Sequence, residues 1–373
     1  MVDGRSPLRY VYLLLLAAVM FFLASYAARW FYDRGSAATL LAAPSVEAPS
    51  DLLAYERNTI EVFQKAAPAV VFVHNLQHYR SFFSWDVTEV QAGTGSGFLW
   101  DGDGHIVTNY HVVQGASRVA VTLIDGKTYR AEIVGVEPRK DLAVLKIDLR
   151  STNVTPFSVK VADSSAVLVG QKAIAIGNPY GLDHTLTVGT VSALGRSMSS
   201  VVEGVTIRDM VQTDAPINPG NSGGPLLDSK GRLIGMNTSI LRDSTGIGFA
   251  VPSNTIKRMV NQIVTFGKPI QAEIGISIFE DRVTRSIGVE GIMIREVQPN
   301  TPAEHSGLRG TTRDRFGNIV LGDIIREIDG QPIRNYDDMY NAFDEKRTGD
   351  VVVMKYLRNG EEDTVEIPVI AVD

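Results

Sequence analysis

Short apolar runs separated by turn residues recur through residues 69–251, and this pattern constrains the fold more than any other feature of the sequence. Each run is long enough for one strand, and dipeptides such as Asp125-Gly126 stand between runs. The predicted strands are residues 69–73, 97–100, 105–108, 119–123, 142–147, 172–176, 186–191, 233–237 and 248–251. Many short strands joined by tight turns predict a mainly β domain, built as antiparallel barrels or a sandwich.

A helix closes this β-rich region, and a different pattern follows it. Ile256, Met259, Val260 and Ile263 have the spacing of one helical face, and Gly267 stands where a helix commonly ends. Beyond it, five or six strand signals and two helices predict a compact α+β domain. We therefore expect domains at residues 56–267 and 268–373.

The amino-terminal region is expected to lie outside both domains. Residues 10–28 are a stretch of 19 uncharged residues, which as a helix would nearly span the ~30 Å hydrocarbon layer of a membrane. A cleaved secretory signal is the alternative, but the apolar region of a signal is usually only ~7–15 residues long. We therefore predict a short stub and one transmembrane anchor at 1–32, followed by an Ala-, Ser- and Pro-rich linker at 33–55.

Composition excludes several classes of function. The net charge is −6, whereas a nucleic-acid-binding protein needs a dense basic face, so no nucleic-acid partner is expected. The chain has no cysteine, which excludes disulfides, thiolate metal sites and a cysteine nucleophile. His74 and His78 are four residues apart but lie among strand residues without a third ligand, so neither a metal nor another cofactor is predicted.

The segment Gly220-Asn221-Ser222-Gly223-Gly224-Pro225 is the sharpest chemical motif. A serine hydroxyl needs a neighbouring base and donors for the oxyanion before it can act as a nucleophile. Flanking glycines allow close backbone approach and turns that direct successive N–H groups to one point. An ordinary turn can have the same Gly-Asn-Ser sequence, so the motif alone does not distinguish a nucleophile loop from a simple turn.

Two further residues complete a candidate triad. Among six histidines, His111 stands at the end of a predicted strand, where a rigid scaffold can hold a base. Asp141 directly precedes the buried-looking run 142–147, although a salt bridge at a strand end is its alternative role. The chain order His, Asp, Ser is that of two-barrel serine proteases and differs from the α/β-hydrolase and subtilisin orders. The sequence therefore predicts a catalytic triad of His111, Asp141 and Ser222.

Several segments resemble the high-temperature-requirement (HtrA, or Deg) serine proteases, from about residue 58 to the end of the chain. They include Thr108-Asn109-Tyr110-His111-Val112, Asp141-Leu142-Ala143-Val144-Leu145, Gly177-Asn178-Pro179, Asn218-Pro219-Gly220-Asn221-Ser222-Gly223-Gly224-Pro225 and Gly235-Met236-Asn237-Thr238. The carboxy-terminal region resembles a PDZ domain through Ile274-Gly275-Ile276 and Leu321-Gly322-Asp323-Ile324-Ile325. The resemblance implies a chymotrypsin-like double β-barrel at 56–267, a PDZ domain at 268–373 and similarity to the anchored, single-PDZ branch of the family.

The resemblance also implies a set of functional residues. The backbone N–H groups of Ser222 and Gly220, helped by Asn221, would form the oxyanion hole. The strand at Ile274-Gly275-Ile276 would bind C-terminal peptides of unfolded proteins, and Arg196, in the loop 195–204, would sense that binding. The residues expected to line an apolar substrate pocket, selecting small aliphatic side chains before the cleaved bond, are Ile217, Ile240 and Leu241.

The family further implies a homotrimer in the inner membrane, with the protease and PDZ domains facing the periplasm. The expected activity is ATP-independent cleavage of misfolded or regulatory extracytoplasmic proteins, as part of a regulated stress response. A general quality-control protease or chaperone is one alternative, and a non-catalytic peptide-binding scaffold is another. Asn221 replaces the aspartate that binds a freed amino terminus in trypsin-like zymogens, so propeptide cleavage is not the expected control.

Overall fold

The computed structural model describes Met20 and residues 51–80, 87–152, 154, 158–179, 181, 183–200, 202, 205–218, 220–238, 246–344 and 346–371. Within the described residues, every helix is too short or too polar to cross a bilayer. The predicted anchor, apart from Met20, and the predicted linker up to residue 50 lie outside the described residues.

The first barrel is a closed sheet of six strands. A helix and a short 3₁₀ turn precede it, α2 (Ala54–Ala66) and η1 (Ala67–Ala69). Around the barrel the strands follow the order β1-β2-β3-β6-β5-β4, and neighbouring strands are antiparallel. The strands are β1 (Val70–Arg80), β2 (Val87–Leu99), β3 (His105–Thr108), β4 (Arg118–Thr122), β5 (Thr128–Glu137) and β6 (Leu142–Lys146), with α3 (Tyr110–Val113), η2 (Pro138–Lys140) and η3 (Leu149–Ser151) in the connections.

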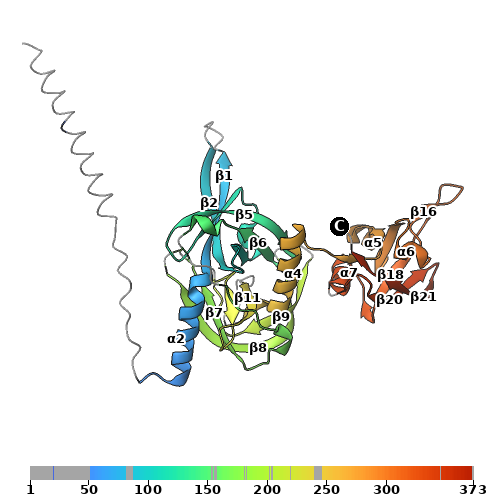
Figure 1. Ribbon diagram of the computed structural model, residues 1–373. Helices are drawn as coiled ribbons and strands as arrows, with labels where there is room; N and C mark the ends of the chain where they lie inside the picture. The colour runs from blue at the N-terminus through green and yellow to red at the C-terminus, as the bar shows by residue number, and fades with distance from the viewer. Residues whose placement is uncertain are drawn as a thin grey trace, which may run out of the picture. The chain divides into compact units, whose positions relative to one another are not determined.

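The second barrel repeats the six-stranded closed architecture, in the order β10-β11-β12-β9-β8-β7. Its elements are η4 (Ser164–Ala166), β7 (Lys172–Gly177), β8 (Thr185–Ser199), β9 (Thr206–Thr213), β10 (Pro225–Leu227), β11 (Leu233–Thr238) and β12 (Gly248–Pro252). Helix α4 (Ser253–Phe266) then packs against strands of both barrels (Figure 1). The prediction of a mainly β chain with two barrels is confirmed.

The two barrels share one hydrophobic core. Phe98 and Leu145 of the first barrel belong to the same buried cluster as Ile174 and Met236 of the second. The helical face predicted for residues 253–267 is buried in this cluster, and Gly267 ends α4 in the left-handed conformation with φ 76°. Continuous burial across both barrels fixes how they sit against each other, and therefore fixes any site built from both.

The last domain is a small sheet with helices and its own core. Its main sheet has the order β14-β15-β18-β20-β21, which leaves β14 at an edge. Gly275 lies between the first two strands of this domain and has a φ of 87°. The elements are β13 (Ala272–Glu273), β14 (Ile276–Ile278), α5 (Asp281–Ser286), β15 (Ile292–Val297), α6 (Pro302–His305), β16 (Thr312–Arg313), β17 (Ile319–Val320), β18 (Ile324–Ile328), β19 (Gln331–Pro332), α7 (Tyr336–Phe343), β20 (Val351–Arg358), β21 (Glu361–Pro368) and β22 (Ile370–Ala371).

Candidate active site

The three residues of the predicted triad lie side by side, although 111 positions separate the outer two. The ring nitrogen Nδ1 of His111 is 2.8 Å from Oδ2 and 3.0 Å from Oδ1 of Asp141. Nε2 of the same ring is 3.2 Å from Oγ of Ser222. His111 belongs to the short helix α3 and not to the end of strand β3, where the sequence analysis placed it. One turn of helix after β3 directs its ring toward the second barrel.

Buried hydrogen bonds hold Asp141 in place. Its side chain is fully buried, and it follows η2 in the left-handed conformation with φ 50°. The backbone N–H of His111 donates to Oδ1 at 3.0 Å, and the Thr238 hydroxyl donates to Oδ2 at 2.9 Å. A carboxylate so placed accepts a hydrogen bond from Nδ1–H of the imidazole, which leaves Nε2 as the acceptor facing Ser222.

Asn109 is a second acceptor for the Ser222 hydroxyl, and its role was not predicted. Its Oδ1 lies 3.0 Å from Ser222 Oγ, and its Nδ2 donates to the backbone oxygen of Asp141 at 3.0 Å. Asn109 is fully buried. A single hydroxyl proton cannot serve both acceptors fully, so Asn109 competes with His111 for it. Asn109 stands two residues before His111 in the sequence, but no motif or spacing marks an asparagine at that position as functional.

The loop before Ser222 has a backbone conformation that favours glycine. Gly220 has a φ of 110°, and a Cβ atom built there would stand 2.3 Å from Cβ of Pro179. The Asn221 side chain forms hydrogen bonds to the backbone of the preceding residues. Its Nδ2 donates to the Pro216 carbonyl at 3.0 Å, and its Oδ1 accepts from the backbone N–H of Asn218 at 3.0 Å. The Asn221 side chain therefore braces the loop from within. Among the described residues, the Gly220 N–H has no hydrogen-bond acceptor.

Of the three residues predicted to line a substrate pocket, the structure describes one. Ile217 packs against the apolar cluster of the second barrel. A Cβ built on Gly248 would lie 2.4 Å from Cγ1 of Ile217, so the two backbone segments approach each other closely at this point. Ile240 and Leu241 lie outside the described residues.

Two of the three residues predicted to bind peptide, Ile274 and Ile276, line a groove of about 500 Å³ in the last domain, and Gly275 stands between them. Ile274 and Ile276 form part of one wall, and the edge strand β14 offers an unpaired strand side. One face of α7 also lines the groove, through Tyr336, Met339 and Phe343. Gly275 needs to be glycine, because a Cβ there would lie 2.3 Å from Cβ of Thr301.

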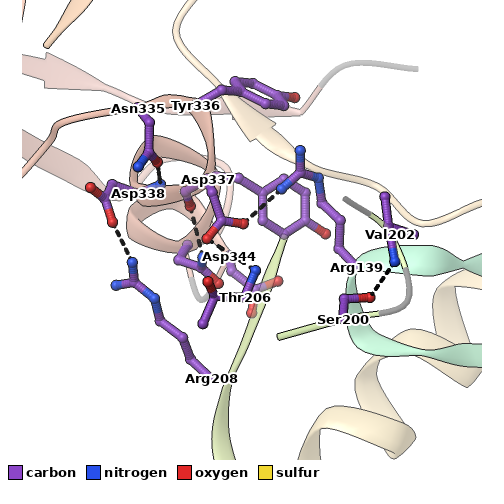
Figure 2. Close-up of polar contacts among 12 residues, drawn as sticks. Arg139, Ser200, Val202, Thr206, Arg208, Asn335, Tyr336, Asp337, Asp338 and Asp344 are labelled. Carbon is purple, nitrogen blue, oxygen red and sulfur yellow. Dashed lines mark hydrogen bonds and ion pairs between the residues drawn. The ribbon is translucent and has the colours of Figure 1, made fainter. Parts of the chain in front are cut away.

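The other face of α7 contacts the first and second barrels (Figure 2). Asp337 accepts from Arg139 of η2 at 2.9 Å and from the backbone N–H of Thr206 at 3.2 Å. Arg208 forms an ion pair with Asp338. Arg196, the predicted sensor, lies on β8 and is exposed, and its Nε donates to Oε1 of Gln212 at 3.1 Å. Its sensing role stays a prediction. The sensing loop 195–204 includes residues 201, 203 and 204, which lie outside the described residues.

A buried charge cluster completes this contact. Lys140 lies 2.8 Å from Oδ2 of Asp344, and Arg258 lies 2.9 Å from the same atom. Burial by itself would raise the pKa of Asp344, but these two cations outweigh it and bring the pKa below its ordinary value. Burial also raises the pKa of Glu137, which accepts from the Tyr340 hydroxyl at 3.1 Å.

Comparison with known proteins agrees with this architecture. Residues 95–236 match the trypsin-like peptidase domain family, and residues 246–369 match the PDZ domain family. The chain is 46% identical over 325 residues to Protease Do-like 1, chloroplastic, of Arabidopsis thaliana, covering 86% of this chain and 74% of that protein. It is 37% identical over 335 residues to Serine protease Do-like HtrA of Bacillus subtilis, covering 82% and 71%.

Solved structures show the same likeness. The HtrA-type protease AlgW with a decapeptide has a TM-score of 0.59 and 31% identity, covering 84% of this chain and 99% of that one. A serine endoprotease from Yersinia pestis has a TM-score of 0.57 and 33% identity, covering 84% and 98%. Two barrels and a PDZ domain define a trypsin-like serine protease with a peptide-binding module. The chain belongs to the HtrA/Deg family of serine proteases.

Proposed function

We propose that this protein is an ATP-independent serine endopeptidase, with Ser222 as nucleophile, His111 as general base and Asp141 as the residue that orients His111. The observation that carries the proposal is the unbroken chain of contacts from Asp141 through His111 to Ser222, at 2.8 Å and 3.2 Å. Each residue comes from a different connection, yet the shared core of the barrels holds all three. The family of the chain supports the same activity.

The proposed reaction follows from this geometry. Ser222 Oγ forms a bond to the carbonyl carbon of a peptide while its proton moves to Nε2 of His111. The carbonyl oxygen becomes an oxyanion, which the N–H groups of Gly220 and Ser222 would stabilise, and Asp141 stabilises the imidazolium. His111 then gives its proton to the leaving amine as the C–N bond breaks. Water then attacks the acyl carbon while His111 takes a proton from it. The ester bond to Ser222 breaks as His111 returns that proton to Oγ.

We further propose that a peptide bound to the PDZ groove regulates this site. Helix α7 supports the idea because one face lines the groove and the other contacts η2, the segment directly before Asp141. The ring of Tyr336 lines the groove and also lies 4.7 Å from the Arg139 guanidinium. A ligand that moves α7 therefore changes contacts two residues from Asp141. The HtrA-type protease AlgW was solved with a decapeptide, which fits a peptide-binding member of the family.

The cellular setting stays a proposal from the sequence. We propose an anchored homotrimer with its domains outside the cytoplasm, acting in a regulated stress response on misfolded or regulatory proteins. Relatives from Chlamydia trachomatis and Salmonella typhimurium are named periplasmic, whereas two from Arabidopsis thaliana are named chloroplastic. Membrane extraction of the full chain, followed by cross-linking of the detergent-solubilised protein, tests both the anchor and the trimer.

Casein cleavage by the full chain in detergent tests the activity. Wild type should cleave casein without ATP, Ser222→Ala should not, and peptides with hydrophobic carboxyl termini should change the rate. Loss of that response on Gly275→Ala, with basal cleavage kept, would place the effect in the groove. If wild type and Ser222→Ala were equally inactive with every peptide, the protease proposal would fail and the peptide-binding scaffold would be favoured.

A further inference from the structure

We infer that Ser96 is a positioning residue for the oxyanion loop, defined here as residues 220–222; the inference rests on the proposed protease activity. Ser96 lies on β2 of the first barrel, while the loop belongs to the second. Its side chain is fully buried. Neither composition nor motif spacing distinguishes it within the run Gly93-Thr94-Gly95-Ser96-Gly97.

Every polar atom of Ser96 is engaged, and two of its bonds go to the loop. Its backbone N–H donates to the Ser222 carbonyl at 2.8 Å. Its hydroxyl oxygen lies 2.5 Å from the Gly220 carbonyl and accepts from the backbone N–H of Asn178 at 2.7 Å. Its own carbonyl accepts from the Thr108 hydroxyl at 2.7 Å. Ser96 is thus a single residue that holds both Gly220 and Ser222 of the loop.

The direction of the hydroxyl proton follows from its partners. The amide N–H of Asn178 can only donate, and the carbonyl of Gly220 can only accept. The Ser96 hydroxyl must therefore accept from Asn178 and donate to Gly220, with no alternative orientation among these partners. A buried hydroxyl with one possible orientation acts as a fixed connector between the two backbone segments.

The two carbonyls that Ser96 binds belong to Gly220 and Ser222, the residues whose N–H groups would bind the oxyanion. Glycine at position 220, with its φ of 110°, gives the backbone wide rotational freedom unless an external contact limits it. Packing restricts the position of the loop, since a Cβ built on Gly177 would lie 2.4 Å from Cα of Asn221. The Ser96 bonds restrict its rotation. Together they hold the loop in one orientation before substrate arrives, which is the condition for effective oxyanion stabilisation.

Replacing Ser96 by alanine should therefore affect the transition state more than substrate binding. Loss of one oxyanion donor typically lowers kcat by about 10²–10³-fold, and Ser96 acts on such donors indirectly. We expect Ser96→Ala to lower kcat by about 10- to 100-fold with KM changed less than about threefold. The affinity for a peptide boronate, which forms a tetrahedral adduct on serine, should fall in parallel with kcat.

Ser253→Ala is the matched control. Ser253 is also fully buried, and its hydroxyl donates to the Ala162 carbonyl at 2.8 Å, away from the oxyanion loop. Ser253→Ala should lower thermal stability about as much as Ser96→Ala does, while its kcat and boronate affinity stay within about threefold of wild type. Ser96→Cys, which fills the site with a larger sulfur atom and a weaker donor, should not exceed wild type in kcat.

The experiment measures kcat, KM, boronate affinity and melting temperature for the full-length wild type and these variants, with Ser222→Ala as the inactive reference. A selective fall in kcat and boronate affinity for Ser96→Ala supports the inference. The inference is overturned if Ser96→Ala behaves like Ser253→Ala, or if Ser96→Cys keeps the kcat of wild type, since a filled site without a strong hydroxyl donor would then suffice. If wild type itself does not exceed Ser222→Ala, the proposed function fails instead, so the two failures are distinguishable.

Discussion

Replacing Asp344 by asparagine should weaken the contact between the PDZ domain and the barrels. The Lys140 and Asp344 side chains are only 6% and 12% exposed, so this pair is shielded from water. Removing one partner of a buried ion pair typically costs about 3–5 kcal/mol, because the remaining charge stays buried and uncompensated. Arg258 is 32% exposed and can turn toward water, which favours the lower end of that range.

A loss of about 3 kcal/mol corresponds to a shift of about 150-fold in the docking equilibrium. Hydrogen–deuterium exchange of the full chain measures this shift, because undocking exposes α7 and η2. We expect faster exchange in both segments for Asp344→Asn, with the exchange of the barrel strands unchanged. Docking should partly return when Lys140→Met is combined with Asp344→Leu, since apolar replacement of a buried pair is often neutral or stabilising and Arg258, which is 32% exposed, can turn toward water.

Glu327→Gln provides the control for this experiment. Glu327 pairs with Lys355 inside the PDZ domain at 3.3 Å, and both side chains are more than one third exposed. Such pairs contribute about 0–1 kcal/mol, so exchange in α7 should hardly change. If Asp344→Asn altered exchange no more than Glu327→Gln, the reasoning from a buried, shielded ion pair would be refuted.

Three further outcomes are expected. The pKa of Asp344 in the folded chain lies below its ordinary value of 3.8, so its contribution to docking is complete above that pH and is lost as the pH falls through the lower, folded value; exchange of α7 measured down an acid series should show this loss, and Asp344→Leu should lack that step. Gly177→Ala should reduce casein cleavage by about 10²-fold or more, because the added Cβ meets the backbone of Asn221 and displaces an oxyanion donor; a rate near that of wild type would contradict the tight packing. Gly275→Ala should abolish peptide binding in fluorescence anisotropy, because the Cβ would strain a φ of 87° and meet Thr301; unchanged affinity would show that this loop does not hold the ligand.

Local patterns predicted the strands that alternate clearly or are buried on both faces. Strands β3, β6 and β7 show continuous burial, and their apolar runs were visible in the sequence. Strand β5 was missed because most of its residues are exposed or half-buried and an irregularity between Ile133 and Gly135 shifts its register. Helix α3 was also missed, since a single turn of four residues is too short to show a helical period.

The candidate site was predicted as far as residue chemistry and chain order allow. His111, Asp141 and Ser222 are distinguishable because few residue types can act as base, orienting acid and nucleophile. The supporting residues Asn109, Ser96 and Thr238 act through hydrogen bonds that exist only once both barrels have folded together.

The interface with the PDZ domain had no sequence signal either. Arg139 and Asp337 are 198 positions apart, and charged residues of these types occur throughout the chain. The described polar contacts with α7 involve Glu137, Arg139, Thr206 and Arg208, whereas the sensing role that analogy gave to Arg196 stays a prediction. Long-range polar contacts depend on tertiary structure that local patterns do not encode.

Covalent labelling by a fluorophosphonate, located by peptide mass spectrometry, is the most direct test of the central claim. The wild-type chain should carry one phosphonyl group, attached to Ser222, and His111→Ala should label far more slowly because no base would accept the hydroxyl proton. Labelling at another serine, or equal rates in wild type and His111→Ala, would contradict a nucleophile activated by this imidazole.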